Sequence, residues 1–381
     1  MRGLLEATES SYNAPIMRKI LLTGGGSGGH IFPLIAVVRE IKKLAQEKNI
    51  KVRLRYLGPP DAYTNYLSKE GIEVRDILSA KLRRYCSLKN LIDIPKFLIA
   101  LFQSFLKVAS FKPDIVFSKG GTGALPVVLA CRCYQIPIII HESDSIPGLT
   151  NKICGKFAGK IFLAFTSAKK FFPENISQVV GNPVRQELLK AIDSNPADLK
   201  KKLGLTPLKP VIVILGGSQG AARINDFVID NLDELLTIGQ IVHQVGPANY
   251  DQIKKYQRAG YQVFDFLRDN YGEVLMAGDL IISRAGAGAI FDIAALGKPS
   301  ILIPLPEAAG SHQLVNAQEY AGTGAAVMIE ELNLNLKSFL REVDNLLSDP
   351  RLLSNSQSAA RAFSKSNPAQ KIAAALLINN Q

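Results

Sequence analysis

The stretch ILLTGGGSGGHIFPLIAVV, residues 20–38, joins an apolar run to a glycine-rich loop and then to a helical pattern. The apolar run is typical of a buried strand, and residues 32–47 have the apolar spacing of an amphipathic helix. Five of the six residues from Gly24 to Gly29 are glycine. Such a loop lets a phosphate approach the backbone N–H groups at a helix start. The stretch therefore predicts an α/β unit with an anion-binding loop.

Three further glycine loops follow apolar strand-like runs and precede helix-like segments. They are Gly120–Gly123, Gly216–Gly220 and Arg284–Gly288. In open α/β sheets, ligands bind at this position, outside the carboxyl ends of the strands. Four loops of this kind indicate phosphorylated ligands.

The alternation of strands and helices restarts once, after a polar connection at 194–210. The strand-like runs are almost continuous Ile, Val and Leu, as in parallel sheets that are buried on both faces. We therefore predict an α/β protein with two doubly wound, Rossmann-like domains whose parallel sheets face a cleft.

The predicted domain boundaries follow from this restart. Residues 1–16 are expected to be a disordered extension, 17–184 an N-terminal domain and 185–362 a C-terminal domain. The pair Asn367-Pro368 is a helix start signal. We expect a helix within 363–381 that packs back on the N-terminal domain.

Several function classes lose support from what the sequence lacks. Gly24, Gly26 and Gly29 form a GxGxxG pattern, but the second strand ends at Tyr56–Pro59 without an acidic residue, and Asp61 lies past two prolines. A dinucleotide-binding site uses an acid at that strand end for the ribose, so an NAD or FAD enzyme is disfavoured. The sequence contains neither a P-loop motif nor a D-x-D motif. We expect no cofactor, no metal and four reduced cysteines.

The net charge of +12 is unevenly distributed. Residues 1–184 contain 26 Lys and Arg against 13 Asp and Glu, whereas residues 185–381 contain 19 against 20. Such asymmetry favours an anionic surface as partner, either a membrane or a nucleic acid. The segment 81–107 has six basic residues beside Leu and Phe, which is typical of an interfacial segment. Its apolar run FLIALFQSFL is too short to span a bilayer, and a core helix with a solvated basic end is the alternative.

Five segments in this order resemble the MurG family of UDP-N-acetylglucosamine transferases, which have the GT-B fold. The segments are GGGSGGHIFPLIAV (24–37), HESDSIPGLTNK (141–152), VGNPVR (180–185), GGSQGAARIND (216–226) and SRAGAGAIFDIAALGKPSILIPLP with HQLVNA (283–306 and 312–317). The resemblance implies that the C-terminal domain binds UDP-N-acetylglucosamine. The N-terminal domain would bind the lipid-linked muramyl-peptide acceptor (lipid I) and an anionic membrane surface, with no nucleic acid. The product would be lipid II, made by a peripheral protein on the cytoplasmic face of the cell membrane.

The resemblance also implies roles for individual residues. Asp292 stands where the family usually has a glutamate that holds the ribose, Ser218 would contact phosphate, and the backbone at Leu267 would read uracil. The other donor-side candidates are Arg185, Gln219, Gly220, Arg284, Ala287, Gly288, His312, Gln313 and Asn316. The acceptor-side candidates are Ser27, Gly28, Gly29, His30, Asp144 and Asn151. Asp144 is itself a departure from the family, whose usual residue there is an amide.

The reaction implied is an inverting displacement, for which the attacking hydroxyl needs a base. His30 and Asp144 are the leading candidates, with His141 and Glu142 also considered. His30 could instead contact the acceptor's diphosphate, and His141 could be a buried structural residue. Three alternatives to the function stay open: another GT-B glycosyltransferase, a UDP-N-acetylglucosamine epimerase, and a nucleotide-sugar-binding protein without turnover.

Overall fold

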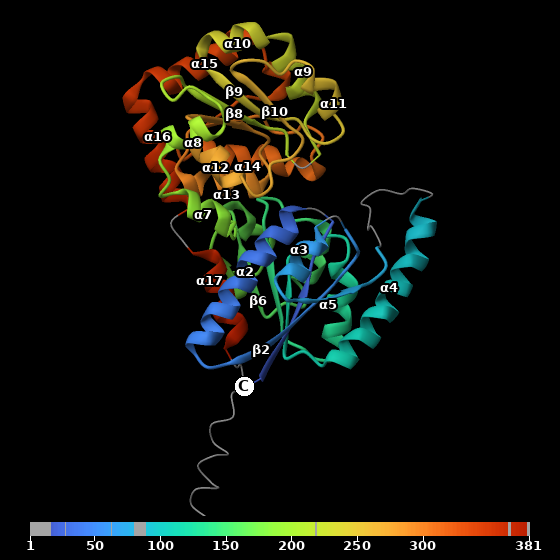
Figure 1. The fold of residues 1–381 in the computed structure, drawn as a ribbon. Coiled ribbons are helices and arrows are strands. Elements are labelled where there is room, and N and C mark those ends of the chain that lie inside the picture. Colours follow the sequence, from blue (N-terminus) through green and yellow to red (C-terminus); the bar gives the residue numbers. More distant parts are fainter. Residues whose placement is uncertain are drawn as a thin grey trace, which may run out of the picture. The chain divides into compact units, whose positions relative to one another are not determined.

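The computed structural model describes residues 17–26, 28–61, 63–79, 89–217, 219–364 and 367–378 (Figure 1). The expected extension 1–16 and the candidates Ser27 and Ser218 therefore lie outside the described residues. The chain forms two compact units. The first comprises the chain up to Glu142, Gly148–Phe162 and the chain from Ala369 onward, and the second comprises Ser143–Pro147 and Leu163–Pro368.

The first sheet has the strand order β3-β2-β1-β4-β5-β6-β7. Its strands are β1 (Met17–Thr23), β2 (Lys51–Gly58), β3 (Glu73–Asp76), β4 (Ile115–Ser118), β5 (Ile138–Glu142), β6 (Lys160–Leu163) and β7 (Ser177–Val179). The helices of the first unit are α2 (Gly28–Glu47), α3 (Thr64–Lys69), α4 (Lys89–Phe111), α5 (Ala124–Cys133), α6 (Leu149–Cys154) and α17 (Pro368–Leu377). The central strands β4 and β5 are buried along their whole length.

The second sheet has the order β10-β9-β8-β11-β12-β13. Its strands are β8 (Val211–Leu215), β9 (Gln240–Gln244), β10 (Tyr261–Phe264), β11 (Leu280–Ser283), β12 (Ser300–Leu302) and β13 (Ala326–Met328). The helices are α7 (Gln186–Ala191), α8 (Pro196–Lys202), α9 (Ala222–Asp230), α10 (Leu232–Ile238), α11 (Tyr250–Lys254), α12 (Tyr271–Ala277), α13 (Ala287–Leu296), α14 (His312–Ala321), α15 (Leu336–Ser348) and α16 (Pro350–Phe363). Short 3₁₀ turns occur at Thr166–Phe171, Glu174–Ile176, Ala309–Ser311 and Glu331–Asn333.

Both sheets have the doubly wound strand order. In the first sheet β2 and β3 lie on one side of β1, and β4 to β7 follow on its other side; β8 divides the second sheet in the same way. The strand pairs of known register are parallel throughout β3-β2-β1-β4-β5 and β10-β9-β8-β11-β12-β13. The prediction of two doubly wound α/β domains is confirmed: parallel strands joined by crossover helices are covered on both faces, which explains their almost continuous Ile, Val and Leu.

Three local features differ from the sequence-based expectations. The polar connection at 194–210 contains helix α8, which Asn195 caps by accepting a hydrogen bond from the Ala197 N–H at 2.9 Å. The helix-like segment after the Gly216–Gly220 loop is divided into two helices at Asn231, whose amide donates to the Phe227 carbonyl and competes with the helical backbone. The second unit begins at Leu163 rather than at 185, and the ring of Phe165 packs edge-on against Phe291 within it.

Helix α4 is longer than its apolar core suggested. Its segment Asp93–Phe111 is long and apolar enough to cross a membrane by length and composition, which corrects the expectation that no segment could. One face of this segment is buried, at Ala100, Ser104, Val108 and Phe111, and the helix packs against α5 (Figure 1). The opposite face is an exposed apolar stripe formed by Ile94, Leu98, Ile99, Phe102 and Leu106. The basic residues Lys81, Arg83 and Arg84 lie outside the described residues, as does the side chain of Lys89.

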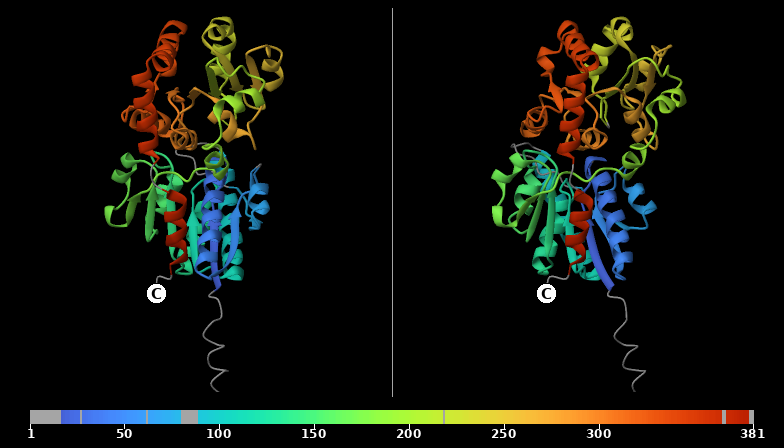
Figure 2. Two further views of the ribbon diagram at one scale, coloured as in Figure 1. Left: turned by 60° about the vertical axis from the view of Figure 1, so that its left-hand side comes forward. Right: turned by 90° about the vertical axis from the view of Figure 1, so that its left-hand side faces the viewer.

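Helix α17 begins at Pro368 and belongs to the first unit (Figure 2). Its buried side chains are Ala369, Ile372, Ala373, Leu376 and Leu377. The guanidinium of Arg18, in β1, donates to the carbonyls of Leu376 and Ile378 at 3.3 and 3.0 Å. The first strand and the last helix of the chain are thus tied together.

Candidate functional site

The glycine loops stand at the topological switch point of each sheet. In the first unit, loops follow β1 and β4, which are neighbours where the strand order reverses. In the second unit, they follow β8 and β11, which are neighbours in the same way. Ligands of open α/β sheets bind in the crevice at this point. Each unit therefore carries a loop pair suited to a phosphate-bearing ligand.

In the first unit, the two loops touch. Gly25 and Gly26 have φ values of +109° and +93°, and a side chain on Gly121 would collide with the Gly25 carbonyl. The Gly24 carbonyl accepts a hydrogen bond from the Tyr56 hydroxyl at 3.0 Å. The Gly26 N–H donates to the carboxylate of Asp61 at 3.1 Å, so a backbone donor of this loop already holds an anionic group.

Helix α2 starts directly after this loop. Gly28 is buried, and a side chain there would meet the ring of Phe32 at 3.0 Å, so that the ring would have to shift to admit it. Gly29 is exposed and His30 half-buried in the first turn. The helix N-terminus carries partial positive charge, which favours an anion beside His30.

Asn151 and His141 form a buried support beneath the second loop. The Asn151 amide donates to the His141 carbonyl at 3.2 Å and to the Glu142 carboxylate at 2.9 Å. A side chain on Gly120 would meet the Asn151 amide at 2.8 Å. His141 is fully buried, with its Nδ1 at 2.6 Å from the Lys119 ammonium. These contacts give Asn151 and His141 a role in positioning the loop.

In the second unit, Gln244 connects two predicted site segments. Its amide donates to the Gly217 carbonyl at 2.9 Å, and its Oε1 accepts from the Leu267 N–H at 3.0 Å. Gly220 packs so closely on the Val245 carbonyl that no side chain would fit there, and Gln219 beside it is exposed. Gln244 at the end of β9 was not among the predicted residues. Its signal in the sequence was only a polar residue ending a buried strand.

Arg185, Tyr271 and Asp292 form a second cluster. The Arg185 Nε lies 3.6 Å from the Asp292 carboxylate, and its guanidinium lies 4.3 Å from the centre of the Tyr271 ring. The Tyr271 hydroxyl and the Arg185 backbone N–H also act on this carboxylate. Burial raises the pKa of Asp292 to about 6, against the lowering effects of Arg185 and Tyr271. Two predicted residues are thus brought together by a tyrosine that the sequence did not single out.

The side chain of Arg284 is buried and is bonded to other groups of the protein. It forms an ion pair with Glu331 and donates to the carbonyls of Ile303 and Pro304 at 3.2 and 3.4 Å. Glu331 also binds Arg223, in the first turn of α9, at 2.6 Å. The Arg284 side chain therefore joins segments around the loop, and its carbonyl accepts the Ser283 hydroxyl at 2.9 Å. The following helix α13 starts at Ala287 and Gly288, where a side chain on Gly288 would meet open space.

The donor-side candidates of helix α14, His312, Gln313 and Asn316, make different contacts. Asn316 is fully buried: its amide donates to Asp144 at 3.0 Å and to the Ala285 carbonyl at 3.1 Å, and its Oδ1 accepts from the Ser145 N–H at 2.8 Å. Gln313 accepts from the Leu305 N–H at 3.0 Å. His312 is half-buried at the start of α14. Asp144 and Asn316 are thus brought together, and Asn316 has little capacity left for a sugar.

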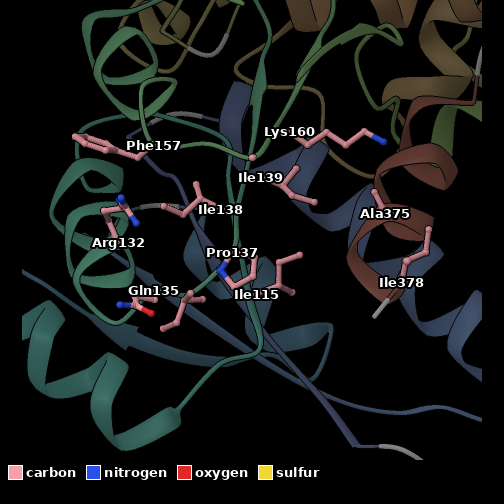
Figure 3. A pocket seen from close by; sticks show the side chains of 12 residues that line it. Ile115, Arg132, Gln135, Pro137, Ile138, Ile139, Phe157, Lys160, Ala375 and Ile378 are labelled. Carbon is pink, nitrogen blue, oxygen red and sulfur yellow. The ribbon is translucent and has the colours of Figure 1, made fainter. Parts of the chain in front are cut away.

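A separate hollow of about 340 Å³ lies in the first unit (Figure 3). It is at the amino ends of the strands, whereas the glycine loops follow their carboxyl ends. It is lined by the first residues of β4, β5 and β6 and by Ala375 and Ile378 near the end of α17. None of the predicted site residues line it. In the part of the chain that the structure describes, no three His, Cys, Asp or Glu side chains are grouped as metal ligands would be.

Comparisons with known proteins identify the family. Residues 20–163 match the glycosyltransferase family 28 N-terminal domain, and residues 211–376 match its C-terminal domain. A Clostridium botulinum protein is 37% identical over 347 residues, which are 91% of this chain and 95% of that protein. A Bacillus cereus protein is 39% identical over 332 residues, or 87% and 92% of the two chains. Both are named UDP-N-acetylglucosamine–N-acetylmuramyl-(pentapeptide) pyrophosphoryl-undecaprenol N-acetylglucosamine transferases.

Solved structures agree with this family. Acinetobacter baumannii MurG superposes with a TM-score of 0.70 at 27% identity, covering 94% of this chain and 99% of that one. A putative UDP-N-acetylglucosamine 2-epimerase from Listeria monocytogenes gives a TM-score of 0.71 at 15% identity, covering 95% and 96%, and shows a shared fold alone. The sequence relatives are named for the transferase reaction, and the structure at the higher identity is named MurG. The chain therefore belongs to the MurG family of glycosyltransferases.

Proposed function

We propose that this glycosyltransferase forms lipid II by a direct, inverting displacement at the second-unit donor site. N-acetylglucosamine passes from UDP-N-acetylglucosamine to the 4-hydroxyl of the muramyl sugar of lipid I. The hydroxyl oxygen forms the new bond to the anomeric carbon as the bond to the β-phosphate breaks. The hydroxyl proton passes to a base, and the electron pair leaves with UDP.

The second unit supports donor binding through its loop pair. The glycine loop at 216–220 and the N-terminus of α13 present backbone N–H groups that suit the diphosphate. The paired Arg185 and Asp292 add a cation for phosphate and a carboxylate for a ribose hydroxyl. As UDP departs, the same donors stabilise its growing charge. This preformed loop pair is the observation that carries the proposal.

The first unit supports acceptor binding in the same manner. Its touching loops at Gly24–Gly29 and Gly120–Gly123 suit the diphosphate of the lipid acceptor. His30 follows the loop, half-buried at the start of α2, and is the better candidate for the base. Asp144 is the weaker one, because its carboxylate accepts the Asn316 amide.

The activity is tested with radiolabelled UDP-N-acetylglucosamine and a short-chain lipid I analogue, in EDTA. We expect label in the lipid fraction only when the acceptor is present, and a loss of about 100-fold or more in kcat for His30→Ala. Label converted without acceptor would instead indicate an epimerase or a hydrolase. Near-normal turnover by His30→Ala would remove this residue from the chemistry.

We further propose that the enzyme is a peripheral protein on the cytoplasmic face of the cell membrane, bound through α4. The exposed stripe at Ile94, Leu98, Ile99, Phe102 and Leu106 is an apolar surface on a helix whose other face is buried. The chain's net charge of +12 favours anionic lipid. An interfacial helix of this kind binds through its apolar face and needs no span.

Vesicle co-sedimentation tests this surface. With phosphatidylglycerol vesicles, Leu98→Asp/Phe102→Asp should reduce binding by about a hundredfold or more, which corresponds to the loss of about 3 kcal/mol from two buried side chains. The matched control is Leu332→Asp, which changes an 89% exposed leucine in the second unit. Equal binding by the double variant and the wild type would locate the membrane surface elsewhere.

A further inference from the structure

The Asp292 carboxylate is surrounded by protein groups. The Arg185 Nε lies 3.6 Å from it, and the Tyr271 hydroxyl and the Arg185 backbone N–H both act on the carboxylate against the rise that burial causes in the pKa of Asp292. The residue is also one methylene shorter than glutamate. Its position therefore depends on the protein groups that face it.

Tyr271 is placed against both members of the pair by close helix packing. Helix α12, which it begins, packs on α7, and Arg185 is the residue that precedes α7. The next residue, Gly272, lies so near α7 that a side chain there would meet the Glu187 carbonyl at 2.7 Å. This approach brings the Tyr271 ring to 4.3 Å from the Arg185 guanidinium, within the range of a cation–π interaction.

The hydroxyl of Tyr271 has a function beyond filling space. The residue is only 6% exposed, and a buried hydroxyl needs a partner, which is the Asp292 carboxylate. A phenylalanine would fill the same volume and keep the ring under Arg185. The hydroxyl therefore serves to orient the carboxylate, and the ring serves to support the cation.

We propose that Tyr271 is a positioning residue of the donor site, which holds Arg185 and Asp292 as a preformed pair for the diphosphate and the ribose. The inference rests on the proposed donor role of these two residues. Because the shorter aspartate is anchored by the tyrosine, donor affinity in this chain depends on a hydroxyl that contacts no donor atom. Tyr271 acts through Asp292.

Donor affinity of Tyr271→Phe tests the proposal. We expect its KM for UDP-N-acetylglucosamine and its Kd for UDP to rise about tenfold, the loss of one hydrogen bond to a charged group. The KM for the lipid acceptor should stay unchanged. The matched control is Tyr261→Phe, which deletes a buried hydroxyl that contacts His243 at 3.0 Å in the same unit. Its donor constants should equal those of the wild type.

A double-mutant cycle separates positioning from general destabilisation. In an Asp292→Asn background, the further change Tyr271→Phe should alter the UDP Kd by less than twofold, because the charged partner is already gone. An unchanged Kd in the single variant, or equal effects of Tyr271→Phe in both backgrounds, would overturn the proposal. If the wild type binds UDP but transfers no sugar, the proposed reaction fails while the Kd comparison still decides the role of Tyr271.

Discussion

Asp292 is a buried acid whose ionisation has a cost. Burial raises its pKa to about 6, although Arg185 and the Tyr271 hydroxyl act in the opposite direction, and Glu187 adds to the rise. An acid with a raised folded pKa favours folding when it is protonated. That contribution is complete below its ordinary pKa of 3.8 and is lost as the pH rises through about 6. At neutral pH the protein therefore keeps a carboxylate that lowers its stability, as expected of a binding group.

Donor affinity should follow the ionisation of Asp292. As the pH falls below about 6, the KM for UDP-N-acetylglucosamine should rise, approaching about tenfold per pH unit, because the protonated acid no longer offers a charged acceptor to the ribose hydroxyl and no longer holds Arg185 in place. Above pH 7 it should be flat. The Asp292→Asn variant should have a high KM that is nearly constant from pH 5 to 8. If this variant kept the wild-type pH profile, another group would be responsible.

Individual contacts were the part of the site that the sequence could not supply. Motif residues such as Arg185 and Asp292 were identified, and the structure brings them together. Their supports Gln244, Tyr271 and Glu331 come from other segments, and each was an ordinary residue in its local pattern. The tertiary fold places the Glu331 carboxylate against Arg284, and no spacing of residues in the sequence indicates this contact. Sequence patterns locate loops, but they do not say which side chains those loops recruit.

The helix starts also show what sequence patterns can and cannot predict about secondary structure. The pair Asn367-Pro368 was used to predict α17, which begins at Pro368. The equivalent pair Asn195-Pro196 starts α8, yet its surroundings are so polar that the segment resembled a connection. Helix α8 has only two buried side chains, Leu199 and the stem of Lys200. A capping signal is therefore informative even where the apolar periodicity is too short to count.

The packing of α7 on α12 depends on Gly272. In most helices, replacing glycine by alanine gains up to about 1 kcal/mol. Here the new methyl group would lie 2.7 Å from the Glu187 carbonyl, and relieving such overpacking costs about 1–3 kcal/mol. The steric effect should win, so that Gly272→Ala lowers the unfolding temperature and raises the donor KM by moving Arg185.

The control for this change is Gly288→Ala, in the first turn of α13, where the methyl group would meet open space. Its unfolding temperature should equal or exceed that of the wild type in a calorimetric scan without ligand. A stabilised Gly272→Ala variant would mean that α7 and α12 can separate at no cost, and the fixed placement of Tyr271 would lose its support.

The whole chain is built so that its last helix completes its first unit. Helix α17 buries Ile372 and Leu376 completely, and the Arg18 guanidinium binds the Leu376 carbonyl. The preceding helix α16 belongs to the second unit, where its residues Ala360 and Phe363 pack with Phe291 and Tyr320. Two neighbouring helices therefore stabilise different units. Such an arrangement makes the stability of each unit separately measurable.

Stability measurements on the two units should respond to different changes. Ile372→Ala should destabilise the first unit by about 3 kcal/mol, as for other large-to-small core substitutions, whereas UDP at about 100 times its Kd should stabilise the second by about 2.7 kcal/mol. Hydrogen exchange reports both units at once: the variant should lose protection in β1, β4 and α17, and UDP should add protection around α12 and α13. The control Lys371→Ala, at the exposed neighbouring position, should change neither. Because donor binding resides in the second unit, Ile372→Ala should keep the wild-type Kd for UDP, and a tenfold weaker Kd would place part of the nucleotide site in the first unit.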